Sequence, residues 1–590
     1  MLSRTFLRAS RAGIRRQVSL ISPLQKRYAS SSSSANAKGA NSIFAFLGGS
    51  LVGALTYKFA FSPGSQQPQE ATPDPIVADF SSYLTSISTL STLPLSDLES
   101  PVYASREKVE QGLTEIREIF KKNTPKGTAY DDSLCVNNTK EELDSHSDTY
   151  FNSHHALPEE RPLYVVYPRS TQEVSEIMKV CHKYRIPVVP TSGRSSLEGH
   201  FIPTRGGITI DISNMNQIVK LDKTDLDITV QGGVGWEELA DYLEEYNLLF
   251  SSDPGPGATI SGICANNASG TNASRYGETY KNVLNLTVVL ADGTVIKTKQ
   301  RPRKSSAGYN LNSLFIGSEG TLGIITEATL KLHVKPVIES VIVVPFNTIE
   351  DAANSVNEIL LKGMELNAIE LLDDKMMQVI NISGETTKKW QVSPTLFLKV
   401  GGSNQQVVNS LIQQIKGIVG NNKNLDFQFA SNDDEKTELW SARKVALWST
   451  INRGKEINDE MLLWTTDAAV PISNLPQFLK ETKADIDNHG LKNSLVAHIG
   501  DGNAHSFILY LPSERDTAEK VVNNMVQRAI RLDGTCTGEH GIGFGKRDFL
   551  VEEVGELPIA VMRKIKLALD PLRILNPDKV FKIDPNEKGH

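Results

Sequence analysis

A stretch of twenty residues, Asp253 to Asn272, constrains the fold of this 590-residue chain more than any other feature. It reads DPGPGATISGICANNASGTN, and it has no charge beyond Asp253 and no side chain larger than isoleucine. Such small residues let the backbone approach an extended anionic ligand, such as a pyrophosphate, very closely. A compact glycine-rich loop without a ligand is the alternative, although loops of this length are usually functional. We therefore expect a ligand-binding loop here.

The surrounding residues 160–336 alternate short β-rich runs with helical patterns, which favours an α/β or α+β architecture. One strand, Ile186–Pro190, is followed directly by a glycine turn at 191–199. A turn of small residues after a buried strand can direct several backbone N–H groups at a phosphate. Ordinary loop chemistry explains this turn about as well, so the turn alone is a weak signal.

Two common nucleotide-binding patterns are excluded. A second glycine turn, Gln231–Trp236, lacks the third glycine of the Rossmann fingerprint, because Glu238 stands at that position. No Walker A lysine motif occurs in the chain.

A group of histidines near the end of the chain predicts a metal site. His498 and His505 flank a Gly-Asp-Gly-Asn turn between two apolar runs, which should bring them together on adjacent strands. A second glycine-rich segment supplies Glu539 and His540. Two histidines and a carboxylate are a typical catalytic metal set, although zinc, manganese and iron(II) cannot be distinguished from it. Each histidine on its own is explained as well by a structural role.

The charge of the chain is unevenly distributed. Residues 1–69 hold nine Lys or Arg and no acid, so the net charge of −7 divides into +9 for this head and −16 for residues 70–590. The acidic remainder argues against nucleic acid as a partner. Four separate cysteines without a CxxC pair argue against a disulfide framework or a zinc finger.

The basic N-terminal segment predicts a targeting signal. Residues 1–34 are Arg-rich, Ser-rich and acid-free, as in a mitochondrial transit peptide, and a disordered basic tail is the alternative. Residues 39–61 form a candidate transmembrane helix, or else a buried or interfacial helix that is removed with the presequence. A linker at 62–104 follows. We expect an inner-membrane anchor with the catalytic body in the intermembrane space.

Four motifs then show a family resemblance. The segments PGPGATISGICANNASG, RYG, VVLADGT and LFIGSEGTLGIITEATLKL resemble, in order, the FAD-binding domain of the vanillyl-alcohol-oxidase/p-cresol-methylhydroxylase flavoprotein family. The resemblance implies an α+β fold in which two subdomains clasp FAD. It places this FAD-binding domain at 105–336, an α+β cap with the metal site at 337–540, and a segment that returns to the FAD domain at 541–590.

The same resemblance implies which residues hold the cofactor. FAD should be bound without a covalent link, because the segment SGRSSLEG has no histidine and His200 lies just beyond it. The implied cofactor-binding residues are Pro190, Thr191, Ser192, Gly193, Arg194, Ser195, Leu197, Pro254, Gly255, Ala258, Thr259, Gly262, Ala265, Asn267, Gly270, Tyr276, Gly277, Glu319, Gly323 and Ile325.

The motifs HIGDGNAH and TGEHGIG resemble the C-terminal domain of FAD-linked D-2-hydroxyacid dehydrogenases. This implies that His498, His505 and Glu539 bind a divalent metal, for which we expect zinc, with manganese and iron as alternatives. It also implies that His540 is the catalytic base and that Arg443, in LWSARKVALWS, binds the substrate carboxylate. The implied reaction is oxidation of D-lactate to pyruvate, with hydride transfer to FAD and electrons passing to cytochrome c.

Three alternatives stay open at this point. A D-2-hydroxyglutarate dehydrogenase shares the metal and base motifs, but its second carboxylate would call for a further cation, which Trp464–Asp467 does not offer. An ether-lipid synthase uses the same scaffold and would not need the mitochondrial head. A non-enzymatic, membrane-anchored binding module is the third.

Overall fold

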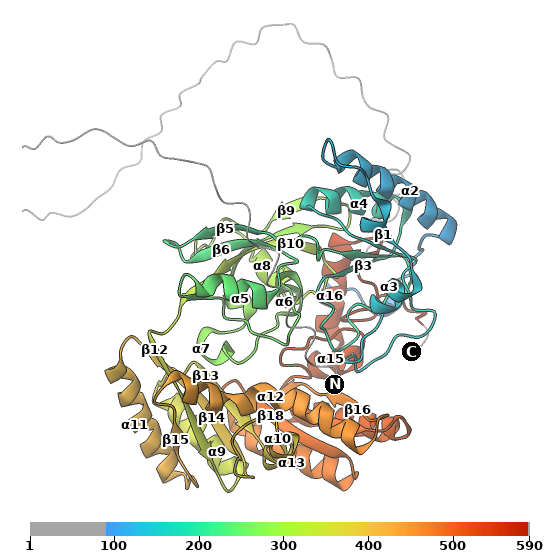
Figure 1. Cartoon of the computed structure of the whole chain (residues 1–590). Helices are drawn as coiled ribbons and strands as arrows, with labels where there is room; N and C mark the ends of the chain where they lie inside the picture. Colours follow the sequence, from blue (N-terminus) through green and yellow to red (C-terminus); the bar gives the residue numbers. More distant parts are fainter. Residues whose placement is uncertain (1–89, 588–590) are drawn as a thin grey trace, which may run out of the picture. The chain divides into compact units, whose positions relative to one another are not determined.

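The computed structural model describes residues 90–587 (Figure 1). The predicted transit peptide at 1–34 and the candidate span at 39–61 lie outside the described residues. None of the helices within 90–587 combines the length and the apolar character that a membrane crossing requires.

The first sheet has four strands in the order β1-β2-β4-β3, and β2, β4 and β3 run parallel. The strands are β1 (Val136–Asn137), β2 (Tyr164–Val166), β3 (Val188–Thr191) and β4 (Ile208–Asp211). Helix α4 (Thr171–Tyr184) connects β2 to β3, and α2 (Arg106–Asn123) packs on α4, while α3 (Lys140–Ser145) follows β1. Val109, Leu113, Ile116 and Phe120 form an apolar stripe on α2 that is buried in the core of this layer.

The second sheet has five antiparallel strands in the order β5-β6-β10-β8-β9. They are β5 (Ile218–Asp222), β6 (Asp227–Gln231), β8 (Val283–Val289), β9 (Val295–Lys297) and β10 (Ile324–Lys331). Helices α5 (Trp236–Glu244), α6 (Ile260–Asn266) and α8 (Leu311–Phe315) contribute to its core, and β7 (Leu248–Leu249) pairs with β11 (His333–Val334).

The long small-residue stretch is not a loop throughout. Helix α6 occupies its middle, and α7 (Ala273–Tyr276) follows directly. The expectation of an irregular loop is therefore corrected, because Ile260, Ile263 and Cys264 give this segment one apolar face that packs into the second core.

The third sheet has eight antiparallel strands, with β15-β12-β14-β13-β18-β19-β16 in order and β17 paired to β19. The strands are β12 (Ile338–Pro345), β13 (Ala368–Leu372), β14 (Thr395–Gly402), β15 (Gln428–Phe429), β16 (Leu462–Thr465), β17 (Ala468–Ala469), β18 (Lys492–His498) and β19 (Asn503–Tyr510). Alternate residues of each strand point to opposite faces, so two cores form. One face is covered by α9 (Ile349–Leu361), α11 (Gln405–Asn421), α13 (Leu475–Asn488) and α14 (Arg515–Arg531), and the other by α10 (Asp374–Ser383) and α12 (Asp433–Ile457).

The end of the chain lies against the first sheet. After α15 (Arg547–Val554) and α16 (Glu556–Leu569), Leu575 forms a parallel bridge with Val188 of β3. The Val188 N–H donates to the carbonyl of Ile574 at 2.8 Å, and the Asn576 N–H donates to the carbonyl of Val188 at 2.7 Å. In Figure 1 the red helix α16 accordingly lies among the blue and green elements. The end of the chain thus extends the edge of the first sheet.

Candidate active site

The two histidines of the Gly-Asp-Gly-Asn hairpin lie on one face of the third sheet. The register of β18 and β19 pairs His498 with Asn503 and Val496 with His505, so both imidazoles project from the same side. Their ring centroids are 5.3 Å apart and the rings are nearly perpendicular. The hairpin that the sequence predicts therefore forms, and it brings the two side chains together.

Glu539 completes a cluster of three ligand-type side chains. Its Oε1 lies 3.3 Å from the Nε2 of His498 and 3.1 Å from the Nε2 of His505. One ligand atom from each of the three residues falls within 4.8 Å of the others. Both histidines are buried, and Glu539 is partly buried. This donor set suits zinc or a similar divalent ion.

Partners outside the cluster orient both rings. The Nδ1 of His498 lies 2.7 Å from Glu370 Oε1, and the Nδ1 of His505 lies 2.9 Å from the carbonyl of Thr466. Each histidine can therefore donate from Nδ1 and keep the Nε2 lone pair for a metal, an arrangement that is general among metal-binding histidines.

The electrostatics of the cluster favour a positive charge between the three side chains. Burial alone would lower the pKa of His498, yet the charges of Glu370 and Glu539 raise it well above its ordinary value. Burial alone would raise the pKa of Glu539, yet His498 and His505 hold it well below its ordinary value. A divalent ion would take over this charge and release the proton on His498. The residues therefore fit a metal.

His540 stands next to this cluster. Its ring stacks on that of His505, with centroids 5.0 Å apart and 17° between the planes. Its Nδ1 is buried and has no hydrogen-bond partner among the described residues. Burial lowers the pKa of His540 to about 4, so the ring is neutral at pH 7 and can accept a proton.

Arg443 reaches the same site from α12. Its Nε donates to Glu370 Oε2 at 2.7 Å, and within residues 90–587 its two terminal amino groups make no hydrogen bond. They are available to a carboxylate, which guanidinium groups bind through parallel hydrogen bonds. Glu370 therefore fixes both Arg443 and His498. Glu370 is not among the residues predicted from the sequence, although a single acid in the apolar strand Ala368–Leu372 is a signal that it has a charged partner.

Three glycine-containing segments of the two smaller sheets lie close together. A methyl group on Gly193 would collide with the backbone of Gly257 and lie 3.3 Å from the Thr259 nitrogen. The Glu319 N–H donates to the carbonyl of Ala265 at 2.9 Å. The first turn, the long stretch and the segment before β10 thus line one region.

This region has buried polar groups without a hydrogen-bond partner among the described residues. The hydroxyls of Thr191, Ser192 and Thr259 are buried and have no hydrogen-bond partner in the described part of the chain. Buried polar groups are nearly always paired. Three such hydroxyls beside the close approach at Gly193 therefore fit a bound anionic cofactor such as FAD.

Several other predicted cofactor residues have partners within the protein. The Glu319 carboxylate accepts the N–H groups of Ile542 and Gly543, each at 2.7 Å, and burial raises its pKa to about 7. The Asn267 side chain binds Glu278 and the Tyr280 N–H. The remaining predicted residues lie on these three segments: Pro190, Arg194, Ser195, Leu197, Pro254, Gly255, Ala258, Gly262, Gly270, Gly323 and Ile325. Tyr276 ends α7, next to Gly277, and its ring lies 4.5 Å from that of His333.

The long stretch also touches the histidine cluster. The Ser269 hydroxyl donates to Glu539 Oε2 at 2.9 Å. The candidate FAD region and the candidate metal cluster are therefore adjacent, although they belong to different sheets.

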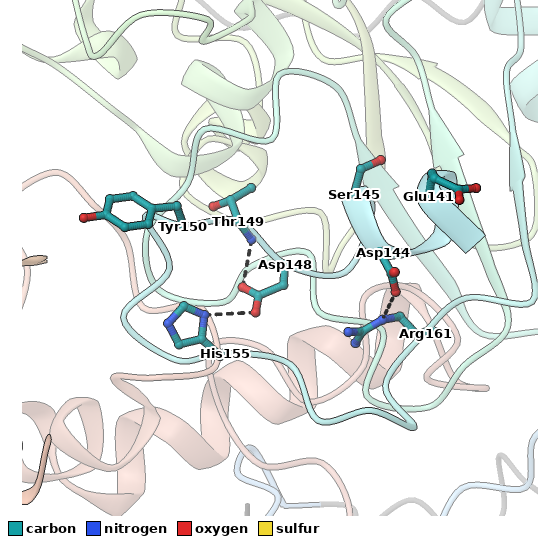
Figure 2. Close-up of a pocket in the computed structure, with 8 residues that line it drawn as sticks. All are labelled: Glu141, Asp144, Ser145, Asp148, Thr149, Tyr150, His155 and Arg161. Atoms are coloured by element: carbon teal, nitrogen blue, oxygen red, sulfur yellow. Dashed lines mark hydrogen bonds and ion pairs between the residues drawn. The ribbon is translucent and has the colours of Figure 1, made fainter. Parts of the chain in front are cut away.

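A surface pocket of about 560 Å³ lies away from these residues. Figure 2 shows that two of its three acids are already paired: Asp148 with the Thr149 N–H and His155, and Asp144 with Arg161. Its lining contains none of the predicted site residues: Glu141, Asp144, Ser145, Asp148, Thr149, Tyr150, His155 and Arg161.

The chain is similar to known proteins over most of its length. Residues 162–299 match the family described as FAD binding domain, and residues 335–580 match that described as FAD linked oxidases, C-terminal domain. The mitochondrial D-lactate dehydrogenase (cytochrome) of Kluyveromyces lactis is 53% identical over 93% of this chain and 92% of that protein. D-lactate dehydrogenase (cytochrome) 1 of Saccharomyces cerevisiae, also mitochondrial, is 53% identical over 85% of each.

A solved structure supports the fold. That of p-cresol methylhydroxylase with substrate bound covers 83% of this chain and all of its own, with a TM-score of 0.66 and 17% identity. The predicted combination of an FAD-binding domain and an FAD-oxidase C-terminal domain, both mixed α and β, is thereby confirmed.

Proposed function

The chain belongs to the family of FAD-linked oxidases that includes the mitochondrial D-lactate dehydrogenases (cytochrome), and from this membership we propose that it oxidises D-lactate to pyruvate with cytochrome c as the final electron acceptor. The observation that carries the proposal is the ring of His540 stacked on His505 of the His498, His505 and Glu539 cluster, with the guanidinium of Arg443 reaching the same Glu370 that orients His498.

Each group of site residues has a separate role in the proposed oxidation of a 2-hydroxy acid. Arg443 binds the substrate carboxylate through its terminal amino groups. His540 takes the proton of the hydroxyl group as the general base. His498, His505 and Glu539 would hold a divalent ion, whose charge would polarise the hydroxyl oxygen and lower its pKa. The glycine segments would hold FAD without a covalent link, and FAD would supply the acceptor for the hydride of C2.

The surroundings of Trp464 support a substrate with one carboxylate. Two cations of the C-terminal half contact the segment Trp464–Asp467, and both are engaged. Lys546 Nζ lies 2.9 Å from the carbonyl of Asp467 and 3.3 Å from Glu198. Arg515 lies over the Trp464 ring at 4.2 Å and donates to the carbonyl of Ser153 at 2.6 Å. A D-2-hydroxyglutarate dehydrogenase would need one such cation for its second carboxylate.

The reduction of cytochrome c by the purified FAD-containing protein tests the proposal. D-lactate should support the reaction, whereas D-2-hydroxyglutarate should support it poorly. Efficient turnover of D-2-hydroxyglutarate with little turnover of D-lactate would replace the proposal by this alternative.

Arg443→Lys is expected to raise the KM for D-lactate more than it lowers kcat. Lysine keeps the charge but cannot make two parallel hydrogen bonds to a carboxylate. The loss of one charge-assisted hydrogen bond costs about 1.5–3 kcal/mol, which corresponds to a KM about 10–100-fold higher. Arg453→Lys, on the same helix but in a surface pair with Glu456, is the control. An unchanged KM in Arg443→Lys would remove the arginine from this role.

The head of the chain supports a mitochondrial inner-membrane location with the catalytic body in the intermembrane space. This part of the proposal depends on the basic, acid-free residues 1–34, the apolar segment at 39–61 and the mitochondrial relatives. In mitoplasts, external protease should digest the body. Protection of the body until the inner membrane is dissolved would place it in the matrix.

A further inference from the structure

Asp467 is a fully buried carboxylate next to the histidine cluster, and neither the sequence motifs nor the mechanism above uses it. It lies between β16 and β17, which both pair with β19. The two ladders share one register, which places Asp467 opposite His505. The backbone position of Asp467 is therefore fixed by β19, the strand that carries the candidate metal ligand His505.

A single oxygen of Asp467 holds the segment that contains Glu539 and His540. Its Oδ2 accepts the backbone N–H groups of Gly538, Glu539 and His540 at 2.8, 2.9 and 2.9 Å. The same oxygen accepts the Thr537 hydroxyl at 2.6 Å. Successive N–H groups that converge on one anion fix the course of a turn. The direction in which the Glu539 and His540 side chains leave the backbone is therefore set by Asp467.

Contacts on both sides of Asp467 also hold it in place. Ala469, two residues after Asp467, exchanges two backbone hydrogen bonds with Thr535. Lys546 Nζ donates to the Asp467 carbonyl and pairs with Glu198, which belongs to the first glycine turn. Glu198 in turn accepts the N–H groups of Phe544 and Gly545 at its carbonyl. The turn around Asp467 is thus tied to the third sheet on one side and to the FAD region on the other.

We propose that Asp467 is a positioning residue that places the catalytic base His540 and the metal ligand Glu539 at the same time. The inference rests on the proposed function for the roles of those two residues. Asp467 itself contacts the backbone of both residues. Its removal should therefore weaken metal binding and slow the chemical step together, while FAD stays bound.

Asp467→Asn tests this in the FAD-containing protein. We expect the affinity of the chelator-treated protein for Zn²⁺ and the kcat with D-lactate each to fall about 10–100-fold, which is the usual cost of losing an outer-shell partner. The KM for D-lactate should change less, because Arg443 is held by Glu370 on another strand. Flavin absorbance should show that FAD is retained.

The matched control is Asp373→Asn. Asp373 is also fully buried and also accepts backbone N–H groups, from Met376 at 2.8 Å and Leu495 at 3.1 Å. It makes no hydrogen bond to the segment Thr537–His540. This variant shows what the loss of a buried structural carboxylate does to the domain in general.

Thr537→Val provides a milder change, because it removes one of the four hydrogen bonds and keeps the charge. It should lower Zn²⁺ affinity and kcat, but by smaller factors than Asp467→Asn does. If Asp467→Asn does not fold, Thr537→Val provides the test of the inference. Zn²⁺ affinity and kcat that match those of Asp373→Asn would overturn the inference. If the wild-type flavin is not reduced by D-lactate, the proposed function fails instead, and Zn²⁺ affinity still tests Asp467.

Discussion

His540→Gln is expected to slow the reduction of the flavin by D-lactate about 10²–10⁴-fold, which is the range that a general base contributes. In the wild type the ring is half-buried, neutral and stacked on His505, and its buried Nδ1 has no protein partner among the described residues. It is therefore ready to accept a proton from a ligand. Glutamine fills a similar volume but is far too weak a base to replace the imidazole.

The rate of flavin reduction after anaerobic mixing with D-lactate is the measurement. FAD content and Zn²⁺ binding should be close to those of the wild type, because Glu539 and both metal-type histidines are intact. His489→Gln is the control, since His489 follows α13 and its ring bonds to the Asp485 carbonyl outside the site. A rate in His540→Gln that equals that of this control would show that His540 is not the base.

Glu539→Gln is expected to lower the affinity for Zn²⁺ by more than the ~10–100-fold that an outer-shell change costs. Glu539 Oε1 lies between the Nε2 atoms of His498 and His505, and it supplies the negative charge that the cluster directs at a cation. The amide of glutamine keeps the shape and can still accept the Ser269 hydroxyl, but it has no charge. Flavin reduction by D-lactate should fall with the metal content.

Zn²⁺ titration of the chelator-treated protein, followed by flavin reduction at each metal level, measures both effects. Glu514→Gln is the matched control, because its carboxylate accepts the Leu511 N–H at 2.8 Å and belongs to the same half of the chain. Full activity of Glu539→Gln without bound metal would show that the cluster has a structural role only.

Local sequence signals predict the parts of the fold that depend on neighbouring residues. The stripe of Val109, Leu113, Ile116 and Phe120 forms the buried face of α2, whose first turn is capped by Ser105. The Gly-Asp-Gly-Asn turn fixes the hairpin of β18 and β19, so His498 and His505 could be paired from their spacing alone.

Contacts between distant segments could not be predicted in the same way. Glu370 meets His498 because β13 pairs with β18, which is a property of the strand order in the third sheet. Thr466 contacts His505, and Asp467 contacts the segment Thr537–His540. Both contacts also depend on the strand order, because β16 and β17 pair with β19. Glu319 lies in a motif that resembles cofactor-binding segments, yet its carboxylate binds the backbone of residues more than two hundred positions later. No pattern within a single segment indicates such partners.

Oxidation of D-lactate at this site can be measured by anaerobic mixing of the FAD-containing protein with D-lactate or with L-lactate. We expect D-lactate to bleach the flavin absorbance in a single turnover and L-lactate to do so far more slowly, because Arg443, the cluster and His540 would fix the orientation of C2. A flavin that D-lactate leaves oxidised, or that both enantiomers reduce at the same rate, would contradict this expectation.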